Sequence, residues 1–127
     1  MRRALFRLGL MLALPLAHAT PPQPDPGQAA LIELRNTIGD GTCQKDAQCH
    51  TVALGAKACG GPAFYLPWSD REGLGERVKE LAATYTRLSK AQAEATGEMS
   101  DCSVISDPGA VCRLNRCVLE PAGRKAV

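Results

Sequence analysis

The sequence predicts a small α+β domain in which one short and one long helix pack on short antiparallel strands, with three disulfides stapling the chain. Three observations lead to this fold class. The chain has 127 residues and six cysteines, and two of its stretches carry apolar residues at helical spacing. The stretches between and after them are short strand-like runs bounded by glycine and proline. An even number of cysteines in a short chain is typical of a disulfide framework.

The first nineteen residues have the three zones of a secretory signal peptide. A start with three arginines precedes an apolar run over residues 8–17, and Ala17, His18 and Ala19 form a small-residue cleavage site. The apolar run has about half of the roughly twenty residues that span a bilayer. The alternative, an N-terminal core helix, would have no polar face. We therefore expect cleavage, export to the periplasm or the cell exterior, and no membrane anchor afterwards.

Loss of residues 1–19 would change the charge balance. This leader holds three of the 15 basic residues and none of the 13 acidic ones, so the mature chain is slightly acidic. Nucleic-acid binding needs a clustered excess of lysine and arginine and is not expected. The mature length suits one domain. We place it at residues 28–120, after a proline-rich lead-in at 20–27 and before a flexible tail at 121–127.

All six cysteines lie in the mature part, where three disulfides are expected because compartments outside the cytoplasm are oxidising. Zinc is the competing use, but zinc sites usually combine closely spaced cysteine pairs with histidines, and His50 is the only mature histidine. Six cysteines allow fifteen pairings, and the sequence does not select one. Cys112 and Cys117, which would face each other across a hairpin, are one candidate bridge. The predicted disulfide cysteines are Cys43, Cys49, Cys59, Cys102, Cys112 and Cys117.

The first helix is predicted over residues 26–38. Asp25 suits the cap position, Pro26 suits the first helical position, and Gln28 stands where a capping box has Glu or Gln. Apolar residues at 31, 34 and 38 follow at helical spacing, and Gly39 can end the helix. After it, CQKDAQC predicts a compact turn. Strands at residues 50–54 and at 64–66, the second ended by Pro67, would then form a hairpin around a glycine-rich connection.

The second helix is predicted over residues 70–96. Ser69 and Glu72 match a capping box, Gly73 and Gly75 weaken the first turn, and Gly97 is the expected stop. The tail returns to strand character, with a strand in CSVIS, a turn at residues 107–109, and a hairpin whose two-residue turn is Leu114 and Asn115. The apolar stripe of the helix consists of Leu74, Val78, Leu81, Tyr85 and Leu88.

The stretches CQKDAQC, ALGAKACGGP and YLPWS, followed by a helix and then by a C-terminal DC and CRLNRC, form a longer pattern. This pattern resembles a group of small exported, cysteine-rich bacterial proteins that carry no assigned function. It covers roughly residues 43–117, and CGGP with the following Tyr65 is its most specific part. The resemblance implies location outside the cytoplasm and disulfide content, and it implies no activity.

Catalytic residues do not stand out in the sequence. His50 is the only mature candidate for a general base, but it follows Cys49, whose sulfur cannot be a nucleophile when it is bonded. No glycine-flanked serine elbow and no closely spaced redox cysteine pair occur. The acids Glu72, Glu76 and Glu80 recur every four residues and indicate a solvated helix face. No cofactor or metal is predicted.

Two places could bind a partner. Tyr65 and Trp68 are interpreted first as core residues that pack on the long helix, and second as an exposed anchor for a protein or glycan, because aromatic residues dominate binding hot spots. Arg113 and Arg116 are interpreted first as a solvated hairpin tip. In the second interpretation, disulfides brace the loop that carries these arginines, and a trypsin-like protease binds this loop as an inhibitor.

These observations favour an exported, non-enzymatic binding module that acts on a protein or glycan in the envelope or outside the cell, with protease inhibition as one form. The alternative from another class is an envelope-associated enzyme that uses carboxylates which the sequence does not identify.

Overall fold

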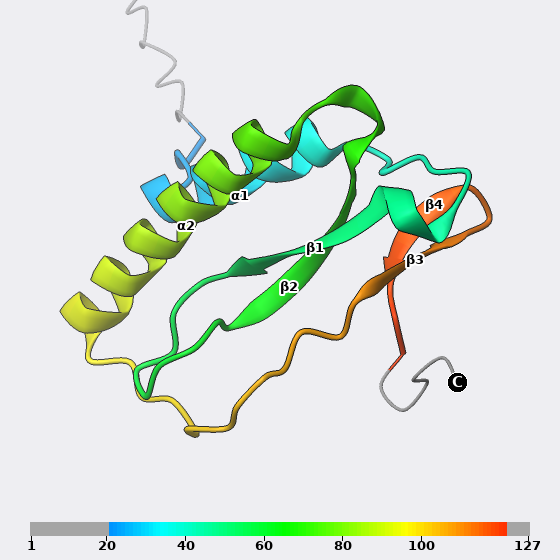
Figure 1. Cartoon of the computed structure of the whole chain (residues 1–127). Coiled ribbons are helices and arrows are strands. Elements are labelled where there is room, and N and C mark those ends of the chain that lie inside the picture. The colour runs from blue at the N-terminus through cyan, green and yellow to red at the C-terminus, as the bar shows by residue number, and fades with distance from the viewer. Residues whose placement is uncertain (1–20, 122–127) are drawn as a thin grey trace, which may run out of the picture.

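A computed structural model describes residues 21–121 of the chain. The predicted signal peptide at 1–19 and the tail from residue 122 onward lie outside the described residues. The described part contains two helices, two short 3₁₀ turns and two hairpins, which confirms the small disulfide-stapled α+β domain. In chain order the elements are α1 (Pro26–Ile38), η1 (Asp46–Gln48), β1 (Cys49–Leu54), β2 (Phe64–Ser69), η2 (Asp70–Glu72), α2 (Gly75–Thr96), β3 (Ala110–Arg113) and β4 (Arg116–Leu119) (Figure 1).

Helix α1 has the predicted bounds, because its start and its end are both encoded locally. The Asp25 carboxylate accepts a hydrogen bond from the Gln28 amide at 2.9 Å, which satisfies one of the free donors of the first turn. At the other end Gly39 has a φ of 57°, and its amide donates to the Arg35 carbonyl at 2.9 Å. A positive φ suits glycine, so the helix ends there.

Strands β1 and β2 form the predicted antiparallel hairpin, with Cys49 opposite Ser69 and Leu54 opposite Phe64. The expectation that Pro67 ends the second strand is wrong, because β2 continues to Ser69. Proline lacks an amide donor but is tolerated on an edge strand. The sheet has only these two strands, so each of them is an edge strand.

Helix α2 begins five residues later than predicted, at Gly75 instead of residue 70. The predicted first turn is a separate 3₁₀ turn, in which the Ser69 hydroxyl accepts a long hydrogen bond from the Arg71 amide at 3.4 Å. Gly73 then adopts a left-handed conformation with a φ of 69°, which interrupts the helical path. The predicted end is confirmed, since Gly97 closes the helix with a φ of 67°.

The C-terminal hairpin of β3 and β4 has the predicted two-residue turn. Leu114 and Asn115 both have positive φ values, 49° and 61°, as the turns of tight hairpins require. The strand predicted in CSVIS is absent: residues 102–106 form no strand. Val104 in this stretch is 91% exposed, so its β-branched side chain has no apolar face to pack on.

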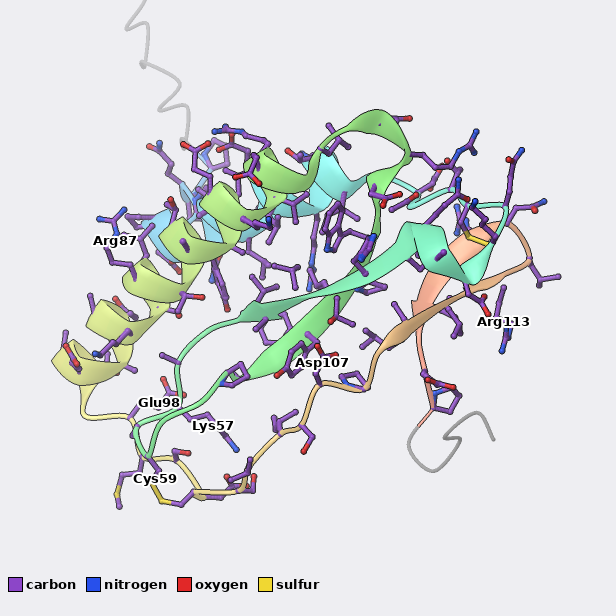
Figure 2. All side chains as sticks on the ribbon, viewed as in Figure 1. Lys57, Cys59, Arg87, Glu98, Asp107 and Arg113 are labelled. Carbon is purple, nitrogen blue, oxygen red and sulfur yellow. A yellow bond between two sulfur atoms is a disulfide. The ribbon has the colours of Figure 1, made fainter. Side chains whose placement is uncertain are left out.

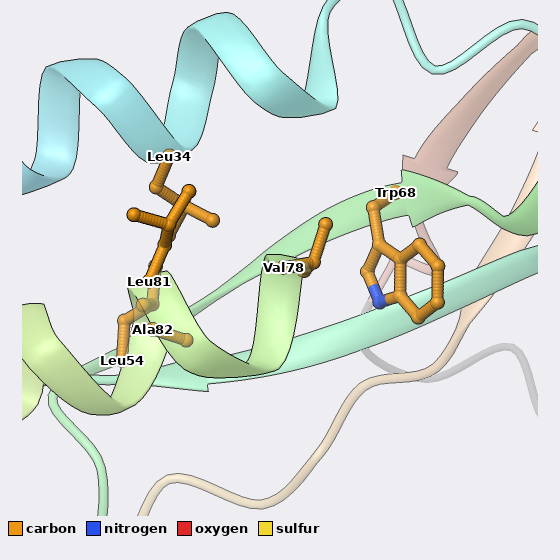
Figure 3. Packing of buried hydrophobic residues seen from close by; sticks show 6 residues of the cluster. All are labelled: Leu34, Leu54, Trp68, Val78, Leu81 and Ala82. Atoms are coloured by element: carbon orange, nitrogen blue, oxygen red, sulfur yellow. The ribbon is translucent and has the colours of Figure 1, made fainter. Parts of the chain in front are cut away.

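The core lies between the two helices and one face of the β1–β2 hairpin (Figure 1). On that face Phe64 meets Tyr85 edge to face at a ring-centroid distance of 6.0 Å. Helices α1 and α2 are also joined at the surface, where Arg77 pairs with Glu33 and, at 3.0 Å, with Glu80. The hydrogen bond with Glu80 raises the pKa of Arg77 above its ordinary value. The buried side chains of this core are Leu34, Leu54, Trp68, Val78, Leu81 and Ala82 (Figure 3).

All six cysteines form disulfides, which pair Cys43 with Cys112, Cys49 with Cys117 and Cys59 with Cys102. The candidate bridge between Cys112 and Cys117 is therefore wrong, although these two residues are direct register partners in the hairpin. Backbone contacts explain the outcome. The Cys43 amide donates to the Asn115 carbonyl, and the Cys117 amide donates to the Gly41 carbonyl. These bonds align the hairpin with the segment that carries the other two cysteines.

Candidate functional site

A groove of about 700 Å³ runs between α2 and β1. Its floor is apolar and is made of small side chains: Ala82, Ala83 and Ala91 from α2, and Val52 and Ala53 from β1. Ala53, Ala83 and Ala91 are exposed. Because alanine side chains are short, another chain could approach the helix and the strand closely here.

The rim of the groove is mainly basic. It carries Lys79, Arg87 and Lys90 against one acid, Glu94. Lys79 pairs with Glu76 at 3.1 Å and Lys90 pairs with Glu94 at 3.9 Å, both as exposed pairs on one helix. Such pairs are weak in water and can be exchanged for other partners. Arg87 is exposed and has no ion pair among the described residues, so it is the positive charge most available to a ligand (Figure 2).

One hydrogen bond joins α2 and β1, the two elements that form the walls of the groove. The Gly55 amide, directly after β1, donates to the Thr86 hydroxyl of α2 at 3.0 Å. Gly55 has a φ of 75°, and a side chain there would come within 2.8 Å of Ala63 Cβ. Glycine is therefore required at this turn. The groove is built on a helix and a strand that are tied together, not on a loop.

Tyr65 and Trp68, the predicted aromatic anchor, lie in two different environments. Trp68 is only 8% exposed and belongs to the core, where its ring lies 5.0 Å from that of His50. Side chains alternate along a strand, so Tyr65 lies on the opposite face of β2 from Trp68, and it is half-buried. The structure does not bring these two residues together as one exposed patch.

The predicted arginine loop is a tight turn whose basic side chains have acidic partners. Arg113 lies 3.8 Å from Asp46, and Arg116 pairs with Asp40 at 2.7 Å. Substrates and substrate-like inhibitors present an extended strand to a protease. The left-handed residues Leu114 and Asn115 fold the chain back at this point, so the geometry does not favour the inhibitor interpretation.

His50 has an acidic partner that the sequence did not reveal. Its Nε2 atom lies 2.8 Å from an Asp70 carboxylate oxygen, at the surface near the start of β1. A nucleophile would have to bond the ring as well. Within residues 21–121 no hydroxyl or thiol hydrogen-bonds to His50, and the nearby Ser69 hydroxyl accepts from the Arg71 amide. The pair gives no support to the enzyme alternative.

The sulfur atoms of Cys43, Cys49 and Cys117 lie within 4.8 Å of one another. Such a group could hold a soft metal only as free thiolates. In this structure each of the three belongs to a disulfide, which leaves no thiolate to bind an ion. These three cysteines therefore offer no zinc ligands while they are disulfide-bonded.

A hydrogen-bonded lysine holds the segment after α2 against the β1–β2 connection. Lys57 Nζ donates to an Asp101 carboxylate oxygen at 2.9 Å and to the Ser103 carbonyl and hydroxyl, both at 2.7 Å. The hydrogen bond from Lys57, followed by those from the Ser103 amide and hydroxyl, lowers the pKa of Asp101 from 3.8 to about 2. The contact lies beside the bridge between Cys59 and Cys102.

The lowered pKa of Asp101 predicts a pH-dependent contribution to stability. A carboxyl with a depressed pKa in the folded state stabilises the protein above its unfolded pKa, and that contribution is lost as the pH falls through the folded value. We expect the wild type to be more stable than Asp101→Asn at pH 5, with the difference shrinking toward pH 2. Urea unfolding of both proteins at the two pH values measures it. An equal difference at both pH values would contradict this role of Asp101.

A second hollow of about 390 Å³ lies between the start of α1 and the second half of α2, near Tyr85 and Leu88. Its polar lining includes Asp25, which already caps α1. We therefore treat the α2–β1 groove, and not this hollow, as the candidate site.

No protein-family model matches this chain, and comparison with curated proteins and with solved structures found no match. We therefore infer the function from the geometry of the groove.

Sequence reasoning missed the groove residues, although one signal for them was present. Lys79, Ala83, Arg87 and Lys90 recur at helical spacing, as small and basic positions on one face of α2. A solvated helix face can show the same pattern. Only the position of β1 beside this face turns it into a groove.

Proposed function

We propose that the protein is exported and acts outside the cytoplasm as a non-enzymatic binding module, which takes up part of a partner in the α2–β1 groove. The observation that carries the binding proposal is the combination of an open apolar floor with a basic rim, in which Arg87 has no ion pair within residues 21–121. Apolar area provides contact, and a few polar groups fix orientation, in most binding sites of this kind.

The disulfides support the proposal of export. All six cysteines form disulfides, which are typical of oxidising compartments. Within residues 21–121 no helix is long and apolar enough to cross a membrane. The signal peptide at residues 1–19, and membership of the group of small exported bacterial proteins that the cysteine pattern resembles, remain part of the proposal.

One experiment tests export and binding together. The chain is expressed in its own host with a photo-crosslinking amino acid in place of Ala83, inside the groove, or in place of Gln44, outside it. We expect intact protein in the exported fraction that begins at residue 20 and carries three disulfides. We also expect one defined cross-linked partner from position 83 and none from position 44. An uncleaved chain in the cytoplasmic fraction would reject export.

The identified partner is then titrated calorimetrically with the purified protein. Arg87→Glu should weaken binding by about tenfold or more, because it reverses a rim charge that has no ion pair among the described residues. Arg71→Glu is the matched control, since Arg71 is equally exposed but lies on η2, outside the groove. Equal loss of affinity in both variants, or cross-linking from position 44 alone, would reject the groove as the binding surface.

A further inference from the structure

The groove contacts the edge of β1 and not one of its faces. Val52 and Ala53 are neighbours in the strand, so their side chains point to opposite faces. A groove that contacts both must lie along the strand edge. The Gly55 amide, just beyond the strand, also donates toward the groove, to Thr86.

This edge of β1 has no partner strand. β1 pairs only with β2, and β3 pairs only with β4, so no strand within residues 21–121 pairs with the other side of β1. Exposed strand edges present unpaired amides and carbonyls that another extended chain can join. The C-terminal hairpin meets β1 through the bridge between Cys49 and Cys117. The segment before β3 also reaches β1, where the Thr51 hydroxyl donates to the Asp107 carboxylate at 2.7 Å. Neither segment lines the groove.

We infer that the partner enters the groove as an extended acidic segment, which adds a strand to β1 and lies between it and α2. This inference rests on the proposed function and names the chemistry of the partner. The alanine floor contacts apolar side chains of the segment, and its acids face Arg87 and the neighbouring lysines.

The dimensions of the groove fit such a segment. The α2 residues that line it extend from Lys79 to Glu94. At about 1.5 Å per helical residue, this is about 22 Å. An extended chain advances about 3.3 Å per residue, so about six or seven residues span the helix wall, and those beside Val52 and Ala53 pair with β1. The rim has three basic residues and one acid over this length, which complements a segment of net negative charge.

The test uses a fluorescein-labelled peptide of eight residues with alternating glutamate and valine, titrated into the full mature protein by fluorescence polarisation. Two further peptides carry N-methyl groups on every second amide, one on the valine amides and the other on the glutamate amides. Alternate amides of a strand point to opposite edges, so a strand added to β1 uses one of these two sets. We expect one methylated peptide to lose binding at least tenfold and the other to keep it.

A peptide with lysine in place of glutamate should not bind. Arg87→Glu should weaken the parent peptide about tenfold, while Arg71→Glu should leave it unchanged. On binding, the amide resonances of Val52 and Ala53 should shift. Equal binding of both methylated peptides would overturn strand addition, and equal binding of the lysine peptide would overturn the acidic preference. A partner cross-linked from position 83 without binding of any acidic peptide would reject this inference and leave the proposed function standing.

Discussion

Replacement of Cys43, Cys49, Cys112 and Cys117 together by alanine should lower the free energy of unfolding by about 7 kcal/mol and release the β3–β4 hairpin. The two bridges connect residues 69 and 68 positions apart, and with Cys59–Cys102 intact either one alone closes a ring of about 28 residues in the unfolded chain. The loss of chain entropy in the unfolded state raises the free energy of unfolding by about 4 kcal/mol for the first bridge. The whole stability of a domain is typically only about 5 to 15 kcal/mol, so the fourfold variant should be largely unfolded at 37 °C.

The effect of removing a single bridge should be smaller. Both bridges join the same two segments, so with Cys43–Cys112 intact the second bridge closes only a short ring through residues 43–49 and 112–117. The double variant Cys49→Ala/Cys117→Ala should therefore lose about 3 kcal/mol. Urea unfolding measures all variants. A fourfold variant no less stable than this double variant would contradict the assignment of two cooperating bridges.

Removal of the third bridge is the matched control for the hairpin. Cys59 and Cys102 are exposed and lie away from β3 and β4. Their replacement by alanine should destabilise the protein but leave the slowly exchanging amides of the β3–β4 hairpin protected in hydrogen exchange. Loss of that protection in this variant would show that the hairpin depends on more than its own two bridges.

Leu34→Ala should be the most damaging single substitution in α1, with a loss of about 3 kcal/mol in the free energy of unfolding. Leu34 is 0% exposed and touches the core formed with α2 and the β1–β2 hairpin (Figure 3). Only Ala30 and Leu34 of α1 are buried, so the leucine is the main apolar anchor of this helix. Its truncation leaves a cavity and removes much of the apolar contact that holds α1 in place.

Ile32→Ala is the control for this prediction. Ile32 lies on the same helix and is 51% exposed, so its truncation should change stability by no more than about 0.5 kcal/mol. Urea unfolding followed by far-ultraviolet circular dichroism compares the two variants. If Leu34→Ala cost no more than Ile32→Ala, α1 would not depend on this contact.

Much of the secondary structure followed from the sequence, because its signals are local. Asp25, Pro26 and Gly39 lie within or next to α1 and determine its bounds. Gly97 ends α2, and the pair Leu114 and Asn115 forms the tight turn between β3 and β4. Each signal acts through bonds to residues a few positions away, so it operates before any tertiary contact forms.

The incorrect expectations concern features that depend on distant residues. Pro67 is tolerated in β2 because the sheet has no third strand on that side. The CSVIS stretch is no strand because none of the strands within residues 21–121 pairs with it and Val104 is exposed. Gly73 separates the 3₁₀ turn from α2, although the capping pattern around Ser69 suggested one continuous helix.

The fold class, the number of disulfides, the bounds of α1, the end of α2 and the turn of the C-terminal hairpin all followed from the amino-acid sequence. The pairing of the cysteines did not, because it depends on backbone hydrogen bonds from Cys43 to Asn115 and from Cys117 to Gly41, which join segments more than seventy residues apart. The groove likewise depends on tertiary packing. The small and basic face of α2 becomes a binding surface only because the core places the free edge of β1 beside it.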